Sequence, residues 1–176
     1  LGTGTEFGVS IAYEVQEEAG GIAQALSLAK DFVGDEKFVV MLGDNIFQDS
    51  LLEAGRAFEN GTDEAHIFLK EVERPQSYGV PRLENGKIVE ILEKPSNAPS
   101  PYAVTGCYLY TPKVFDVIQA IKPSSRGELE ITDVNDHYVK NGVLSHTVLG
   151  GFWGDCGESI DQMMDVAGFV QKNMAN

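Results

Sequence analysis

The 176-residue sequence is poor in cysteine and histidine and has no long apolar run. It has two cysteines, Cys107 and Cys156, and three histidines, and neither set has the spacing of a metal site. No apolar run approaches the roughly 20 residues that cross a bilayer, and no signal peptide is visible. We therefore expect a protein of the reducing cytoplasm that has no membrane partner.

Positive charge is also scarce. Lysine and arginine number 13 against 27 aspartates and glutamates, so the formal net charge is −14, and no basic run occurs. This balance excludes a nucleic-acid backbone as partner. A phosphorylated ligand would need a divalent cation or a local pair of basic residues to offset the charge. The 43% hydrophobic content argues against disorder, and the length predicts a single core.

The most informative segment is the apolar run 38–42, which is followed by Gly43 and Asp44. Such a run predicts a strand buried on both faces, as in a parallel sheet covered by helices. Ligands of open α/β sheets bind outside the carboxyl ends of the strands. Asp44 is thus placed to hold a metal or a sugar hydroxyl. Alternatively, Asp44 or Asn45 caps a following helix.

The rest of the chain alternates between strand-like and helix-like patterns. Strands are expected at 9–15, 38–42, 65–72, 78–83, 87–92, 102–110 and 143–149. Helices are expected at 20–32, 50–59, 112–121, 129–140 and 158–172. Asn85-Gly86 predicts a tight hairpin, and Pro81 marks an edge strand. We predict one α/β domain over 1–176, Rossmann-like and three-layered, with a mixed, mostly parallel sheet and helices on both faces.

The beginning of the sequence does not fit a complete doubly wound fold. Such folds usually open with a strand, a Gly-rich turn and a helix. Residues 1–8 contain Gly2, Gly4 and Gly8, but no strand precedes them and no helix follows. We read them as a loop, and we expect the domain to lack its first strand–loop–helix unit.

A series of short motifs follows the order and spacing of one family. The motifs are Tyr13-Glu-Val-Gln16, Ala19-Gly-Gly21-Ile-Ala-Gln24-Ala25, Leu42-Gly-Asp44-Asn-Ile-Phe47, Tyr78-Gly79-Val80, Glu93-Lys94-Pro95, Tyr102-Ala-Val104-Thr-Gly106 and Arg126-Gly-Glu-Leu-Glu-Ile-Thr-Asp133. With them the chain resembles the sugar-1-phosphate nucleotidylyltransferases, above all the short glucose-1-phosphate thymidylyltransferases of dTDP-rhamnose and cell-surface polysaccharide synthesis.

The resemblance implies displacement at the α-phosphate of dTTP or UTP by the phosphate of glucose 1-phosphate, with release of pyrophosphate. Because this nucleophile is already anionic, catalysis needs alignment and charge neutralisation rather than a general base. Mg²⁺ suits both tasks. By resemblance, Asp44 and Asp155 are its carboxylate ligands. An alternative for Asp155 is a cap on the helix expected from 158.

The resemblance also implies roles on the nucleotide and phosphate side. Gln16 would pair with the edge of thymine or uracil, since a side-chain amide offers both a donor and an acceptor. Gly21 would lie closely under the base. Lys94 and Arg126 resemble phosphate-binding residues.

On the sugar side, the resemblance assigns Glu93 to the glucose hydroxyls and Tyr78, Gly79 and Val104 to the wall of the hexose pocket. Glu128, Glu130 and Asp133 are expected at a helix start, in capping roles. His66, His137 and His146 share no metal spacing.

The chain departs from the family pattern in two places. The Gly-rich signature with its arginine and lysine has no counterpart in 1–176, and Cys156-Gly157-Glu158 replaces the usual small residue, Gly and Thr. Glu158 adds negative charge near the phosphates. We therefore expect this chain alone to be poorly active. We also expect apolar surface around 38–42, where the absent unit would pack, to associate with a second copy, as a homo-oligomer, or with another chain. The alternatives are a uridylyltransferase and a catalytically silent nucleotide-sugar-binding module.

Overall fold

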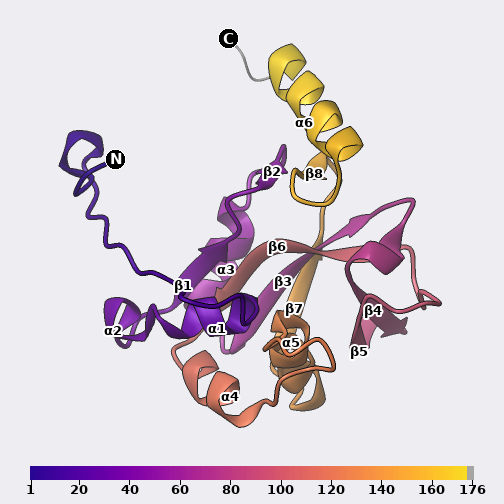
Figure 1. The fold of residues 1–176 in the computed structure, drawn as a ribbon. Helices are drawn as coiled ribbons and strands as arrows, with labels where there is room; N and C mark the ends of the chain where they lie inside the picture. The colour runs from indigo at the N-terminus through magenta and orange to yellow at the C-terminus, as the bar shows by residue number, and fades with distance from the viewer. Residues whose placement is uncertain (174–176) are drawn as a thin grey trace.

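The structure, a computed structural model, describes residues 1–173 as a central sheet covered by helices (Figure 1). The strands are β1 (Phe38–Met41), β2 (Asn45–Phe47), β3 (Ala65–Glu71), β4 (Gly79–Glu84), β5 (Lys87–Glu93), β6 (Tyr102–Tyr110), β7 (Leu144–Val148) and β8 (Trp153–Asp155). The α-helices are α1 (Ile22–Ser27), α2 (Lys30–Val33), α3 (Leu52–Asn60), α4 (Val114–Ala120), α5 (Ile131–Lys140) and α6 (Ile160–Asn173), and single 3₁₀ turns cover Thr5–Phe7 and Pro75–Ser77. None of these helices is both long enough and apolar enough to cross a membrane.

The central sheet has the strand order β1-β6-β3-β7. β6 is antiparallel to both of its neighbours, β1 and β3, and β3 and β7 run parallel. The expected mixed α/β fold is confirmed, but the prediction of a mostly parallel sheet is wrong for the described residues. The prediction failed because an apolar run shows that a strand is buried and carries no information on the direction of its neighbours.

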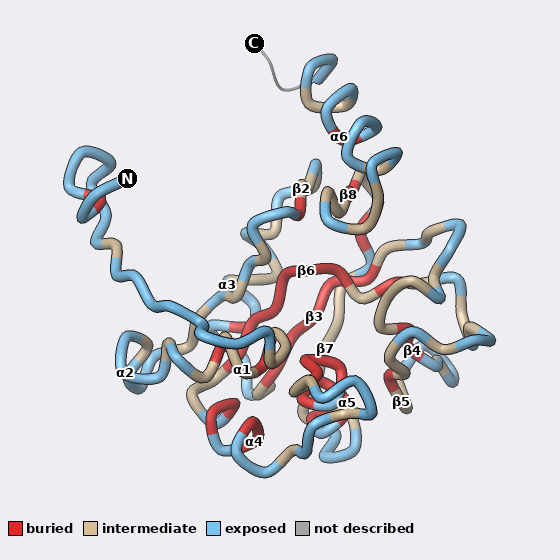
Figure 2. Tube along the Cα trace, viewed as in Figure 1, coloured by how far each residue is buried: buried red, intermediate tan, exposed pale blue. Residues whose placement is uncertain are grey.

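Two apolar clusters cover the two faces of the sheet. Alternate residues of β3 belong to different clusters: Ile67 and Leu69 face one way and Phe68 the other. The first cluster joins the sheet to α1, α4 and α5, and the second joins it to α3 and the small β2–β8 sheet. The expected covering of both faces is thus confirmed, and β3 and β6 are the most buried strands (Figure 2).

β1 departs from the expected burial. Val39 and Met41 are 58% and 54% exposed, whereas Phe38 and Val40 pack against the first cluster. The prediction that this strand is buried on both faces is therefore wrong. β1 is an edge strand of the sheet, and the second cluster covers β3 and β6 but does not include Val39 or Met41. Self-association through this apolar surface stays a prediction.

The other predicted helices and strands agree with the structure only in part. The hairpin is confirmed, because Asn85 and Gly86 both have positive φ, 51° and 75°, as a two-residue turn between β4 and β5 requires. The strand expected at 9–15 is wrong: this segment is irregular and almost wholly exposed, with no partner strand among the described residues (Figure 2). The helix expected at 20–32 is divided into α1 and α2, and near the break the Ser27 hydroxyl donates to the Gln24 carbonyl, 2.7 Å away.

His66 makes stability depend on pH. Its side chain is 7% exposed on β3, and its ring nitrogens lie 2.8 Å from Ser145 Oγ and 3.0 Å from Thr147 Oγ1. Burial, with a smaller contribution from His146, lowers the pKa of His66 to about 4. Because an unfolded histidine binds its proton near pH 6.5, acidification from pH 7 to 5 favours the unfolded chain. We expect a loss of about 2 kcal/mol.

Urea unfolding at pH 7 and pH 5 measures this effect. The matched variant His66→Gln keeps a polar side chain at this position but does not titrate, so it should lose the part of the pH dependence that His66 contributes, while His146, whose pKa burial also lowers, remains. If the free energy of unfolding changed by the same amount between pH 7 and pH 5 in the wild type and in His66→Gln, the assignment to His66 would be contradicted.

Candidate functional site

An open cleft of about 610 Å³ collects most of the residues that the sequence singled out. Eight of them line it: Tyr78, Gly79, Glu93, Lys94, Val104, Arg126, Asp44 and Asp155. They come from loops and strand ends far apart in the chain, including the ends of β1, β5 and β8. Gln16 and Gly21 do not line the cleft, although Ile22, the first residue of α1, does.

Asp44 and Asp155 are brought together by the β2–β8 pair. The register of the two strands places Asn45 opposite Asp155, and the Cys156 amide donates to the Asp44 carbonyl at 2.8 Å. A β-carbon added to Gly157 would lie 2.6 Å from Asp44 Oδ2 and 3.3 Å from Asp155 Oδ1. Both carboxylates therefore reach the space above Gly157, which the absent side chain leaves open.

The electrostatics of this pair agree with its geometry. Burial raises the pKa of Asp155, and the nearby Asp44 carboxylate raises it further, against the hydrogen bond from the Gly157 amide. Neither acid caps a helix. Strand β2 follows Asp44, and ahead of α6 it is the Ser159 hydroxyl that accepts from the Gln162 amide, at 3.2 Å. The capping alternatives for Asp44 and Asp155 are therefore wrong.

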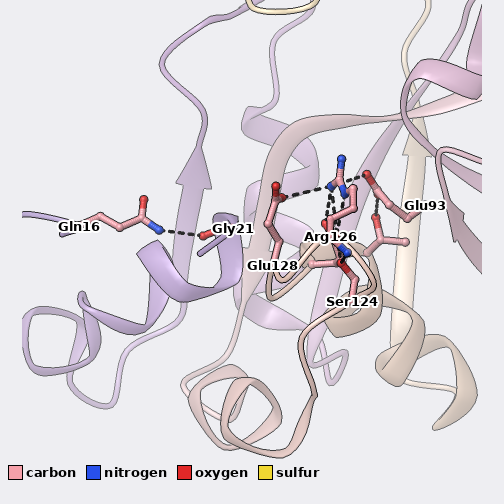
Figure 3. Close-up of polar contacts among 8 residues, drawn as sticks. Gln16, Gly21, Glu93, Ser124, Arg126 and Glu128 are labelled. Carbon is pink, nitrogen blue, oxygen red and sulfur yellow. Dashed lines mark hydrogen bonds and ion pairs between the residues drawn. The ribbon is translucent and has the colours of Figure 1, made fainter. Parts of the chain in front are cut away.

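Arg126 is held by three carboxylates (Figure 3). Its guanidinium lies 2.9 Å from Glu130, 3.2 Å from Glu128 and 3.5 Å from Glu93. The Glu130 side chain is only 8% exposed and also accepts from the Ser124 hydroxyl at 2.7 Å. The hydrogen bond to Glu130 is the main reason why the pKa of Arg126 is raised.

Glu130 occupies the N-cap position of α5, as expected, but its side chain makes no capping hydrogen bond. The prediction of a capping role is therefore wrong for Glu130: its carboxylate turns to Arg126 and Ser124 instead. Asp133 lies in the first turn of α5, as expected. Sequence could not show that an acid four residues after Arg126 would be buried against it.

Lys94 is the other cation of the cleft. Its backbone has φ 41°, and its amide donates to the Tyr78 carbonyl at 3.0 Å, which brings the end of β5 against the start of β4. Among residues 1–173, no acidic side chain forms an ion pair with Lys94. Its ammonium group is thus available to an anion in the cleft.

Glu93 and Gly79 form the wall beside Lys94. The Thr132 hydroxyl donates to Glu93 Oε2 at 2.5 Å, and Glu93 also contacts Arg126. A β-carbon on Gly79 would lie 3.0 Å from Thr132 Oγ1, so glycine permits this close approach. Thr132 was missed by sequence reasoning because its importance depends on the face that α5 turns toward the cleft.

Gln16 is separated from the cluster around Arg126 (Figure 3). Its amide nitrogen donates to the Gly21 carbonyl at 3.1 Å and to Gln24 Oε1 at 2.7 Å. Gly21 has φ 95°, and a β-carbon there would lie 2.5 Å from the Leu129 carbonyl oxygen. Gly21 therefore lets the start of α1 pack on the segment that leads into α5.

Glu158 also lines the cleft, but its carboxylate is engaged elsewhere. Ser77 Oγ donates to it at 3.1 Å, and Arg74 lies 3.6 Å away. Hydrogen bonds from Ser159 and Ser77, together with Arg74, lower the pKa of Glu158. The added negative charge expected from the sequence is thus present, with Arg74 beside it.

Comparisons with known proteins support the family resemblance found in the sequence. A family model described as nucleotidyl transferase matches residues 1–173. The chain is 40% identical to a glucose-1-phosphate thymidylyltransferase of Neisseria meningitidis, over 97% of the chain and 60% of the relative. It is 42% identical to a low-salt glycan biosynthesis nucleotidyltransferase of Haloferax volcanii, over 92% of the chain and 46% of the relative. The chain thus spans about half to three-fifths of the length of these relatives.

Solved structures show the same fold. A crystal structure of a putative glucose-1-phosphate thymidylyltransferase from Bacillus anthracis, in complex with a sucrose, superposes with a TM-score of 0.92 at 46% identity, over 99% of this chain and 71% of that one. A UDP-glucose pyrophosphorylase complexed with UDP-glucose gives a TM-score of 0.78 at 27% identity, over 92% of this chain and 66% of that one.

Proposed function

Because the chain belongs to the nucleotidyl transferase family, we propose that its cleft is the active site of a sugar-1-phosphate nucleotidyltransferase that uses dTTP and glucose 1-phosphate. The observation that carries the proposal is the pair Asp44 and Asp155, which converges above Gly157 in a cleft that the cation Lys94 also lines. The thymidylyl group is preferred over the uridylyl group because the thymidylyltransferase of Neisseria meningitidis and the putative one of Bacillus anthracis share 40% and 46% identity with the chain, against 27% for the UDP-glucose enzyme.

In the proposed reaction, an oxygen of the sugar phosphate attacks the α-phosphorus of dTTP. The new phosphorus–oxygen bond forms as the bond to the β-phosphate breaks, and pyrophosphate leaves with the electron pair. No proton has to be removed from the nucleophile, so the protein's task is to align the reactants and neutralise charge. In this proposal Lys94 binds the sugar phosphate and Glu93 accepts hydrogen bonds from sugar hydroxyls, which is supported by the position of both residues on the lining of the cleft.

Mg²⁺ fits the carboxylate pair. Among residues 1–173, no group of three or more His, Cys, Asp or Glu side chains could hold a metal. Two carboxylates suffice for Mg²⁺, because this ion usually keeps water and substrate phosphate oxygens in its remaining positions. Asp44 and Asp155 would hold it, and when bound it supplies positive charge to the phosphates.

The remaining residues complete the proposed site. Tyr78, Gly79 and Val104 form the wall against the hexose. Gln16 and Gly21 stay our proposal for the base side, and base recognition by Gln16 requires its amide to leave Gln24. Arg126 can reach a phosphate only by giving up part of its contact with Glu93, Glu128 or Glu130.

Isothermal calorimetry with dTDP-glucose and Mg²⁺ tests this function. We expect saturable binding with one site per chain, and weaker binding of UDP-glucose. If calorimetry detected no heat of binding for dTDP-glucose, for UDP-glucose or for glucose 1-phosphate, the proposed function would be refuted. Pyrophosphate release from dTTP and glucose 1-phosphate then separates an enzyme from the alternative, a module that binds nucleotide sugar without turnover.

The same instrument tests a second expectation, that dTDP-glucose binds at least roughly tenfold more tightly than dTTP. The cleft contains six acidic residues, Asp44, Glu93, Glu128, Glu130, Asp155 and Glu158, against the cations Lys94 and Arg126. A triphosphate brings more negative charge into this cleft and no hexose to meet Glu93. The comparison is made at matched Mg²⁺ and ionic strength. Tighter binding of dTTP would show that further groups on this chain neutralise the triphosphate.

A further inference from the structure

Asn45, the neighbour of Asp44 in the chain, uses both polar atoms of its side chain in hydrogen bonds. It begins β2, is 7% exposed, and follows Asp44 directly in the chain. Its Oδ1 accepts from the Gly106 amide at 2.9 Å and from the Trp153 indole at 2.8 Å. Its Nδ2 donates to Asp44 Oδ1 at 2.9 Å.

The chemistry of the partners fixes the orientation of this amide. The Gly106 amide and the Trp153 indole can only donate, so the atom facing them must be the oxygen. The nitrogen is therefore turned to Asp44, whose carboxylate accepts. If the amide were flipped, its NH₂ group would face the Gly106 and Trp153 donors, and its oxygen would face the Asp44 carboxylate.

Gly106 makes room for this arrangement. A β-carbon at Gly106 would lie 2.6 Å from Asn45 Oδ1 and 2.7 Å from its Cγ. Asn45 thus sits in a space that a glycine of β6 leaves open, between the centre of the main sheet and Trp153 of β8. Three segments of the chain determine where its amide nitrogen points.

The hydrogen bond to Asn45 leaves the two oxygens of Asp44 in different places. Oδ1 is bonded to the buried amide, and Oδ2 is directed to the space above Gly157, where Asp155 Oδ1 also lies. We propose that Asn45 is a positioning residue: it holds the Asp44 carboxylate in the rotamer that binds the divalent cation. This inference rests on the proposed function, because it takes Asp44 as a metal ligand.

A purely structural role for Asn45 would not require its hydrogen bond to Asp44. The Gly106 and Trp153 donors require only an acceptor, whereas the third hydrogen bond goes to the carboxylate itself. Outer partners of metal ligands typically change metal affinity by about 10- to 100-fold when removed. The effect expected for Asn45 is thus on metal affinity and not only on folding.

The experiment measures free Mn²⁺ by electron paramagnetic resonance during titration in the presence of dTDP-glucose. We expect Asn45→Ala to weaken Mn²⁺ binding by about 10- to 100-fold. Binding of dTDP-glucose without metal, in EDTA, should change far less. In an Asp44→Asn background, Asn45→Ala should cause no further loss of Mn²⁺ affinity, because the two residues act on one event.

Asn135→Ala is the matched control. Asn135 is also a buried asparagine, it accepts from the Tyr110 hydroxyl at 2.6 Å, and it makes no hydrogen bond to Asp44 or Asp155. Urea midpoints should fall in both alanine variants, whereas Mn²⁺ affinity should fall only for Asn45→Ala. Should Asn45→Ala fail to fold, Trp153→Phe keeps an aromatic ring but removes the indole donor together with part of the ring that packs on Tyr78, and a loss of a few-fold is expected.

The outcomes separate the two proposals. Equal Mn²⁺ affinity in wild type and Asn45→Ala, or an unchanged affinity in Trp153→Phe if that variant replaces it, overturns the positioning role alone. So does a loss that is fully additive with Asp44→Asn. If Asp44→Asn binds Mn²⁺ as tightly as the wild type does, the metal site and the positioning role are overturned together.

Discussion

Replacing Asp44 by asparagine is expected to weaken Mn²⁺ binding, with dTDP-glucose present, on the order of 100-fold. The substitution keeps the shape of the side chain and removes one of the two formal charges above Gly157. Interactions made by a charged oxygen contribute roughly 1.5–3 kcal/mol, and 1.4 kcal/mol is a factor of about ten in affinity. Titration of Mn²⁺ followed by electron paramagnetic resonance gives the two dissociation constants.

Asp155→Asn should have a similar effect, and the double variant should be far from additive, because both carboxylates serve the same ion. Asp161→Asn is the control. Asp161 is an exposed acid in the first turn of α6, so its loss changes net charge by the same amount outside the cleft. A loss of Mn²⁺ affinity in Asp161→Asn as large as in Asp44→Asn would attribute the effect to net charge and remove the ligand assignment.

Arg126→Ala is expected to destabilise the fold by roughly 2–3 kcal/mol, the largest stability effect expected in the cleft. The variant leaves the buried Glu130 carboxylate with Ser124 as its remaining hydrogen-bond partner. Loss of one partner of a buried ion pair costs about 3–5 kcal/mol, and the partial exposure of Arg126 reduces this value. Urea unfolding at pH 7 measures the change.

Lys94→Ala provides the comparison, since Lys94 is an exposed cation of the same cleft with no ion pair among residues 1–173. Its effect on stability should stay within about 0.5 kcal/mol. Adding Glu130→Gln to Arg126→Ala should recover part of the loss, because the buried charge is then removed. If Arg126→Ala were as stable as Lys94→Ala, the buried pair would be energetically unimportant.

The contrast between these two cations shows how far residue type alone can go. Both were predicted to bind phosphate, and both line the cleft. Only the folded structure distinguishes a lysine without an ion pair from an arginine surrounded by Glu93, Glu128 and Glu130. The difference depends on which face α5 presents and on the turn that carries Arg126, and neither has a signature in the local sequence.

Elements governed by short-range preferences were predictable. The Asn85-Gly86 hairpin depends on two residues that tolerate positive φ, and β6 and α5 follow long periodic patterns. β2 and β8 were missed because three residues are too few to show a period. The segment 9–15 alternates like a strand, yet it pairs with no strand among the described residues and is irregular.

By itself, the sequence determined the α/β class and the family, because periodicity and ordered motifs are local properties, and it singled out Asp44 and Asp155 as candidate ligands only through the family resemblance. Tertiary structure decided the direction of the strands, the exposure of one face of β1 and the meeting of Asp44 with Asp155. It also decided that Asn45 turns its amide nitrogen to Asp44. These features depend on hydrogen bonds and packing between segments distant in the chain, and no local pattern specifies which distant groups will be neighbours.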